Sequence, residues 1–109
     1  SCWMRAREFD EAIAPLTRAA ELADTGDSFV RLAEVQTQRR EWEGVVSAAD
    51  RALEKGRLTD SALANLLKGV ALYNLDRDEE AVRPLQAAAQ AEKHRNMARG
   101  YLGMIEQGI

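Results

Sequence analysis

The stretch Trp42-Glu43-Gly44-Val45, with Ala52 seven residues after Val45, carries the pattern that decides the fold of this chain. The pattern is an aromatic or acidic residue, two acidic or small residues, a small apolar residue, and then the later alanine. It recurs 33 residues earlier and 36 residues later, as Phe9-Asp10-Glu11-Ala12 with Ala19 and as Asp78-Glu79-Glu80-Ala81 with Ala88. A period in the mid-thirties made of helix-forming residues predicts stacked helical hairpins. Such a stack presents a curved surface, so the pattern favours a protein that binds a partner.

Apolar residues follow helical spacing along the rest of the chain as well. The stretch from Leu63 to Leu75 is apolar on more than one face, which predicts a helix packed on both sides. No segment alternates with the period of two that indicates a strand. The predicted fold is therefore all-α, with helices over residues 1–7, 9–23, 27–39, 43–55, 60–75, 78–92 and 96–107.

The residues between these segments predict how the helices begin and end. Thr25 or Asp27 is expected to cap the helix over 27–39, and Thr59-Asp60 offers an N-cap to the helix that follows. Lys55-Gly56-Arg57 has the basic charge and the glycine that are typical of a helix C-terminus. Lys93-His94-Arg95 is expected to close the helix over 78–92, with His94 in a solvated turn.

Two prolines and three small residues add detail to the repeat. Pro15 and Pro84 fall inside predicted helices, where a proline removes a backbone donor and bends the helix. We expect both on solvent-facing sides, where water can replace the lost hydrogen bond. Ala33, Gly69 and Gly103 are expected where the two helices of one hairpin cross closely, because larger side chains would push the axes apart.

Composition excludes several classes of function. The 109 residues suffice for one domain, and 46% of them are hydrophobic and 30% charged, as in ordinary globular proteins. The formal charge of −3 argues against a nucleic-acid surface, which needs clustered Lys and Arg. No apolar run approaches the roughly 20 residues that cross a bilayer.

Residues that could carry catalysis or bind a metal are sparse. Cys2 is the only cysteine and His94 the only histidine, so neither an internal disulfide nor a zinc site of the usual spacing can form. The chain has no Gly-rich phosphate loop, no Ser/His/Asp set and no Cys/His pair. We therefore predict neither an enzyme nor a cofactor.

The spacing resembles the tetratricopeptide repeat, whose pattern is W-x2-L-G-x2-Y, then A-x3-F, then a later Ala and Pro. The second copy matches it with Phe29, Leu32, Ala33, Gln36, Val45, Ala49 and Ala52, and the third with Asn65, Lys68, Gly69, Leu72, Ala81, Leu85 and Ala88. The first copy is cut, with Trp3 at the tyrosine place, and Leu102-Gly103 restarts the motif. Lys68 replaces the usual leucine, and the closing proline is missing from each copy.

This resemblance implies a right-handed superhelix of about three hairpins and a terminal helix. A partial repeat over 1–25 would precede repeats over 26–58 and 59–95, with a capping helix over 96–107. Because a natural solenoid needs a polar end repeat, the cut first copy predicts that the chain is a C-terminal piece of a longer protein.

Four strings carry a narrower resemblance. Ser1-Cys2-Trp3, Leu22-Ala23-Asp24-Thr25-Gly26, Leu53-Glu54-Lys55-Gly56 and Gly69-Val70-Ala71-Leu72-Tyr73-Asn74-Leu75 are similar to the C-terminal part of bacterial envelope tetratricopeptide proteins. Those proteins are encoded beside TonB–ExbB–ExbD systems. The similarity implies an adaptor role in the periplasm or cell envelope.

In the tetratricopeptide family, the first helices of the hairpins line a concave groove that binds a peptide or a partner helix. The resemblance assigns residues of three helices to this groove. They are Asp27, Val30, Arg31, Glu34, Thr37 and Gln38 from the second copy, Leu63, Leu66, Leu67, Val70, Tyr73 and Asn74 from the third, and Met97, Tyr101 and Met104 from the last helix. Tyr73 and Tyr101 would be aromatic anchors and Arg31 a charged one. The leucines of the third copy are more simply explained as core, because an apolar stripe at helical spacing is usually buried.

Three other functions stay open on the sequence. The chain could be the interaction or regulatory domain of an enzyme whose catalytic part lies elsewhere. It could bind RNA through a related helical repeat, although its acidic charge opposes this. It could also form homo-oligomers, through a face around Trp3, Phe9 and Ile13 or through Tyr101 and Ile105 of the last helix.

Overall fold

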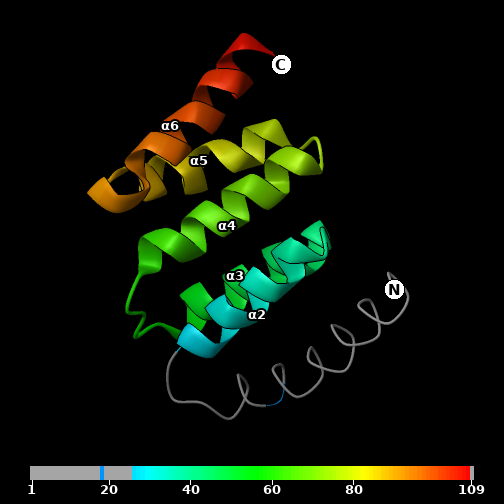
Figure 1. Ribbon diagram of the computed structural model, residues 1–109, viewed down its shortest axis with the longest axis vertical. Helices are drawn as coiled ribbons and strands as arrows, with labels where there is room; N and C mark the ends of the chain where they lie inside the picture. Colours follow the sequence, from blue (N-terminus) through cyan, green and yellow to red (C-terminus); the bar gives the residue numbers. More distant parts are fainter. Residues whose placement is uncertain (1–17, 19–25, 109) are drawn as a thin grey trace.

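The computed structural model describes residue 18 and residues 26–108 of the chain. Over these residues the structure is helical and contains no strand, as the sequence predicted (Figure 1). The elements are α2 (Asp27–Gln38), α3 (Trp42–Lys55), α4 (Ser61–Asn74), α5 (Asp78–Ala89) and α6 (Glu92–Gln107). The predicted helices over 1–7 and 9–23, together with Trp3, Ala12 and Pro15, lie outside the described residues.

The α2–α3 and α4–α5 connections share one turn geometry, 36 residues apart. Arg40 and Asp76 both adopt a positive φ, at 62° and 61°. The amide that follows each, from Glu41 and Arg77, donates to the carbonyl five residues earlier at 3.0 and 2.9 Å. This is the Schellman arrangement, which satisfies the last carbonyls of a helix and turns the chain sharply. The spacing seen in the sequence therefore corresponds to two hairpins with the same turn.

The described helices form two layers, and α4 contacts all four of the other helices. Each helix packs against the next along the chain, and α4 also contacts both α2 and α6, whereas α3 and α5 do not contact each other. Figure 1 shows the α2–α3 hairpin, the α4–α5 hairpin and α6 following one another through the molecule. The chain thus places α2, α4 and α6 in one layer, which we call the α2/α4/α6 layer.

Two apolar clusters meet at α4. The first contains Phe29, Val30, Leu32, Ala33, Val45, Ala48, Ala52, Ala64 and Ala71. The second contains Leu66, Leu72, Ala81, Leu85, Ala88 and Ala98. Because α4 contributes buried residues to both clusters, the prediction that this helix is packed on both sides is confirmed.

The small residues behave as expected at Gly69 but not at Gly103. A Cβ on Gly69 would lie 2.6 Å from Leu85 Cγ, so α4 and α5 can cross at this distance only with glycine there. A Cβ on Gly103 would meet no atom within 4 Å. The predicted close crossing at Gly103 is wrong, because no described helix follows α6 to cover it.

Pro84 lies inside α5 and is buried, so the prediction of a solvent-facing proline is wrong. It stands 36 residues after Ala48, which is also buried. The position therefore faces the interior in both hairpins, where a compact apolar side chain fits. Proline supplies that shape at the loss of one intrahelical hydrogen bond.

Lys68, which replaces the leucine of the tetratricopeptide pattern, forms an ion pair with Asp50 of α3. The two partners lie on helices of neighbouring hairpins, and their side chains are 27% and 50% exposed. A pair as exposed as this contributes little stability. The substitution is therefore accommodated at the edge of the α3–α4 contact and not inside a cluster.

The boundary between the last two helices differs from the prediction. The helix α5 ends at Ala89 and α6 begins at Glu92, so Lys93-His94-Arg95 lies in the first turn of α6 and does not close α5. The dipole rule favours basic residues at a helix C-terminus, and that rule led to the wrong boundary. Contacts with α4 and α5, described below, compensate the basic residues at this N-terminus.

Candidate protein-interaction surface

Three of the predicted groove residues of α2 face solvent, whereas Val30 is buried in the first cluster, so its assignment to the groove is wrong. Arg31, Glu34 and Gln38 are exposed, and they lie three or four residues apart on one side of the helix. They form a continuous polar strip along α2. Such a strip can offer hydrogen bonds and charges to a partner without disturbing the core.

The groove residues of α4 divide into core and surface. Leu66 is only 5% exposed and belongs to the second cluster, so its side chain packs in the interior. Asn74 is exposed, and its side-chain amide donates to the Val70 carbonyl at 2.8 Å. The residue itself is exposed and lies at the end of α4, so the carbonyl oxygen of its side chain remains available at the surface.

Tyr73 and Tyr101 lie together at the α4–α6 contact. Their rings meet edge to face, with centroids 5.4 Å apart and planes at 72°, a favourable geometry for an aromatic pair. The Tyr73 hydroxyl lies 3.9 Å from Met104 Sδ. Both tyrosines are half-buried and pack against the second cluster. They therefore hold α4 to α6 and expose only part of their surface.

Met97 is the most exposed large apolar side chain of the described residues, at 58%. It lies on α6, one turn before Gly100, where a Cβ would meet no atom within 4 Å. An apolar side chain with an unoccupied glycine surface beside it is suited to contact with a partner. The polar strip of α2 has no exposed apolar side chain of this size, so Met97 is the apolar contact that the described part of the α2/α4/α6 layer offers.

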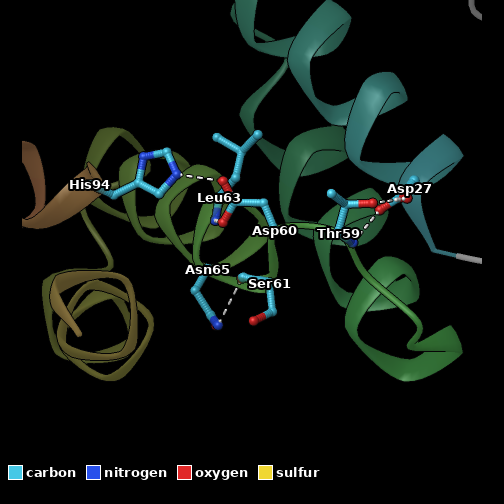
Figure 2. A network of polar contacts seen from close by, with 7 residues as sticks. All are labelled: Asp27, Thr59, Asp60, Ser61, Leu63, Asn65 and His94. Carbon is cyan, nitrogen blue, oxygen red and sulfur yellow. Dashed lines mark hydrogen bonds and ion pairs between the residues drawn. The ribbon is translucent and has the colours of Figure 1, made fainter. Parts of the chain in front are cut away.

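Polar contacts tie the start of α2 to the α3–α4 connection (Figure 2). The Thr59 amide donates to Asp27 Oδ1 at 2.9 Å, and the Thr59 hydroxyl donates to Asp27 Oδ2 at 2.7 Å. The Gly26 amide donates to the Gly56 carbonyl at 2.8 Å. Asp27 makes no cap hydrogen bond in α2, so the prediction that it caps this helix is wrong; Thr25 lies outside the described residues.

A second set of contacts ties the start of α4 to the start of α6. Asp60 caps α4, as predicted, by accepting from the Leu63 amide at 3.1 Å. Its other oxygen, Oδ2, lies 2.7 Å from His94 Nε2 (Figure 2). The two side chains are 29% and 12% exposed, so the expectation that His94 lies in a solvated turn is wrong. One carboxylate thus joins two helix N-termini.

These contacts lower the pKa of both aspartates. Hydrogen bonds from the Thr59 backbone and then its side chain lower the pKa of Asp27. The hydrogen bond from His94 is the largest cause of the lowered pKa of Asp60. Glu80 likewise has a lowered pKa, because it accepts hydrogen bonds from Arg77. Each group is therefore held in its charged form by its neighbours.

Protein stability is expected to fall in acid because of these three carboxylates. A carboxyl whose pKa is lower in the folded state stabilises the fold above its unfolded pKa, about 4 for Asp and Glu. That contribution disappears as the pH falls through the lowered values. Urea denaturation should therefore give a constant midpoint from about pH 5 to 7 and a falling one below about pH 4. The Asp27→Asn variant should show a weaker fall, and an equal fall in both proteins would contradict the role of Asp27.

Sequence reasoning found Asp60 as a cap but missed both partners, Thr59 for Asp27 and His94 for Asp60. Each partner lies about one repeat after its aspartate, 32 residues for Asp27–Thr59 and 34 for Asp60–His94. Residues near a helix start that are one repeat period apart lie at the starts of neighbouring hairpins. The spacing of these pairs could therefore have indicated that their side chains meet.

Phe29 lines a hollow of about 400 Å³ with Arg51, Glu54 and Lys55. The Arg51 guanidinium lies 4.8 Å and the Lys55 ammonium 5.5 Å from the centre of the Phe29 ring. Both distances allow cation–π attraction. The two cations therefore cover the edge of the first cluster, a role that the sequence pattern did not reveal.

No family model, curated protein or solved structure matches this chain. Within the part of the chain that the structure describes, no helix has the length and apolarity to span a membrane. No group of three His, Cys, Asp or Glu side chains in that part is placed to hold a metal ion.

Proposed function

We propose that this chain is a tetratricopeptide-like helical repeat that binds a peptide or a partner helix on the α2/α4/α6 layer. The proposal gives it a non-enzymatic role as a scaffold or adaptor. The narrower sequence resemblance supports a place in a bacterial envelope complex, in the periplasm or at the cell envelope.

The repeated hairpin carries this proposal. The α2–α3 and α4–α5 hairpins have the same turn, 36 residues apart, and pack against each other through α4. Their first helices, α2 and α4, are in contact, whereas their second helices, α3 and α5, are not. A layer whose helices are closer together than those of the other layer is the inner layer of a curved stack. An inner surface of this kind suits an extended peptide or an amphipathic helix.

The exposed residues of this layer suggest which side chains of a partner it would bind. The strip of Arg31, Glu34 and Gln38 offers charges of both signs and an amide, while Met97 offers an apolar contact on α6. Tyr73 of α4 and Tyr101 of α6 belong to the same layer and are half-buried. We therefore expect a partner segment with polar side chains at one end and an apolar anchor at the other.

Changing exposed residues of this layer should weaken binding without unfolding the protein. We expect a variant with Arg31→Ala, Glu34→Ala and Met97→Ala to lose at least about tenfold in partner capture, because hot-spot truncations commonly cost more than 1 kcal/mol each. Its thermal stability should change little, since all three side chains face solvent. The measurement is quantitative pull-down from a cell lysate, compared with circular dichroism of the same variant.

A matched control lies on the opposite layer. Arg83→Ala and Gln86→Ala remove two exposed side chains from α5 and should leave capture unchanged. Equal loss in the control, or full capture by the triple variant, would contradict binding on the α2/α4/α6 layer. Variants of Tyr73 and Tyr101 are less suitable, because their contact also holds α4 to α6.

The alternatives from the sequence gain no specific support. Tyr101 and Ile105, through which two copies could pair, pack against the second cluster of the same chain. The role of an interaction domain within a larger enzyme uses the same surface as the proposed scaffold. It therefore makes the same prediction for the variants above.

A further inference from the structure

The first turn of α6 carries three consecutive basic residues, Lys93, His94 and Arg95, at the end where a helix disfavours positive charge. The N-cap residue that precedes α6 is Ala91, whose side chain cannot form a capping hydrogen bond. Glu92 is the acidic residue of this first turn, and it is exposed. The sequence of α6 alone therefore gives a poor helix start, so its stability must come from elements packed against it.

Groups at the ends of two neighbouring helices supply the negative partners that the basic first turn of α6 lacks. Asp60, the cap of α4, accepts from His94, and the Ala89 carbonyl at the end of α5 accepts from Arg95 Nε at 3.0 Å. The first partner is a full negative charge, and the second is a carbonyl at the negative end of a helix dipole. The chain between α5 and α6 is two residues long, so both contacts act close to the start of α6.

We infer that the charge of Asp60 controls the docking of α6, which acts as an acid-released cover over the second apolar cluster. Ala98, Tyr101, Leu102 and Ile105 of α6 pack in or against this cluster. When Asp60 becomes neutral, the first turn of α6 loses its charged partner and keeps its basic residues. The helix then opens locally more often, which exposes the second cluster while the first cluster stays packed.

The groups around Asp60 support this direction. From α6 it is faced by His94 and Lys93, whose charges both favour its ionised form. The last turn of α5, residues 86–89, contains no charged side chain. On α4 itself the Leu63 amide donates to Asp60, and the hydrogen bond from His94 is the main cause of the lowered pKa of Asp60. Protonation of Asp60 therefore removes its interaction with α6 and retains an oxygen that can cap α4.

The experiment compares amide hydrogen exchange in the whole chain with that in an Asp60→Asn variant. Asparagine is a good N-cap, so α4 should keep its cap and only the charge is lost. At neutral pH we expect exchange in α6 to become about tenfold faster, as for loss of one charge-assisted hydrogen bond, while α2 and α3 are unchanged. His94→Ala should give the same selective effect. Asp27→Asn is the matched control and should leave α6 unchanged.

The acid arm uses the same proteins below about pH 4, with exchange corrected for its intrinsic pH dependence. The unsubstituted protein should then approach the α6 exchange of Asp60→Asn, and the variant itself should show a smaller added response in α6. Of the described carboxyls whose pKa is lowered, only Asp27 and Glu80 still contribute to the acid response of that variant. Unchanged α6 exchange in Asp60→Asn would overturn the inference. So would equal acceleration in all described helices of the variant at neutral pH. An acid response of α6 as large in the variant as in the unsubstituted protein would also overturn it, because the effect would then belong to Glu92 or another carboxyl.

Discussion

Replacing Leu85 with alanine is expected to lower the free energy of unfolding by about 3 kcal/mol. Leu85 is fully buried in the second cluster, and its side chain occupies the space that Gly69 leaves open on α4. Truncation removes apolar contact and leaves a cavity between α4 and α5, because the backbone around a close crossing can collapse only in part. Urea denaturation followed by far-ultraviolet circular dichroism measures the change.

The control for Leu85 is its neighbour on the same helix. Gln86→Ala removes a side chain of similar length from the exposed side of α5 and should change stability by less than about 0.5 kcal/mol. A loss of less than about 1 kcal/mol for Leu85→Ala would show that the α4–α5 contact is looser than the structure indicates.

The second large effect is expected at Gly69, where valine should cost about 2–3 kcal/mol. Its Cβ would lie 2.6 and 2.7 Å from Leu85 Cγ and Cδ2 and 3.3 Å from the Leu85 amide nitrogen. Leu85 is enclosed and cannot move aside freely, so α4 and α5 must separate. Thermal and urea denaturation of Gly69→Val should both register this loss.

Gly100→Ala provides the comparison for Gly69, because both glycines lie inside helices and only Gly69 faces another helix. A Cβ on Gly100 meets open space, and alanine restricts the unfolded chain, so Gly100→Ala should stabilise by about 0.5–1 kcal/mol. Gly69→Ala should instead destabilise. Equal gains from both alanine substitutions would disprove the steric argument. If the Gly69→Ala loss shrinks when Leu85 is also alanine, the two residues are coupled through this contact.

The helical fold was predictable because its signal is periodic and local. Apolar spacing located α2 to α6, and the 36-residue spacing of Val45 and Ala81 corresponds to two hairpins with the same turn. The two-sided apolar pattern of α4 also predicted its central place. These features depend on which faces of a helix are apolar, and the order of residues records that directly.

The candidate surface was less predictable because its residues depend on contacts between distant segments. Leu66 has the same chemical character in a groove as in a core; its helical spacing favoured the core, and its packing in the second cluster confirms this. His94 and its basic neighbours satisfy the rule for a helix end, yet they begin a helix because Asp60 and the Ala89 carbonyl lie opposite. Local preferences of a few tenths of a kcal/mol yield to such tertiary contacts.

The central position of α4 has a consequence for how the fold would respond to a bound partner. A ligand that binds only the native state raises its stability by an amount that grows with the logarithm of the ligand concentration divided by Kd. Because α4 forms part of both apolar clusters, a ligand held against α4 would transmit that gain to both halves of the molecule. A ligand held only against α6 would reinforce the second half and leave the first as it was.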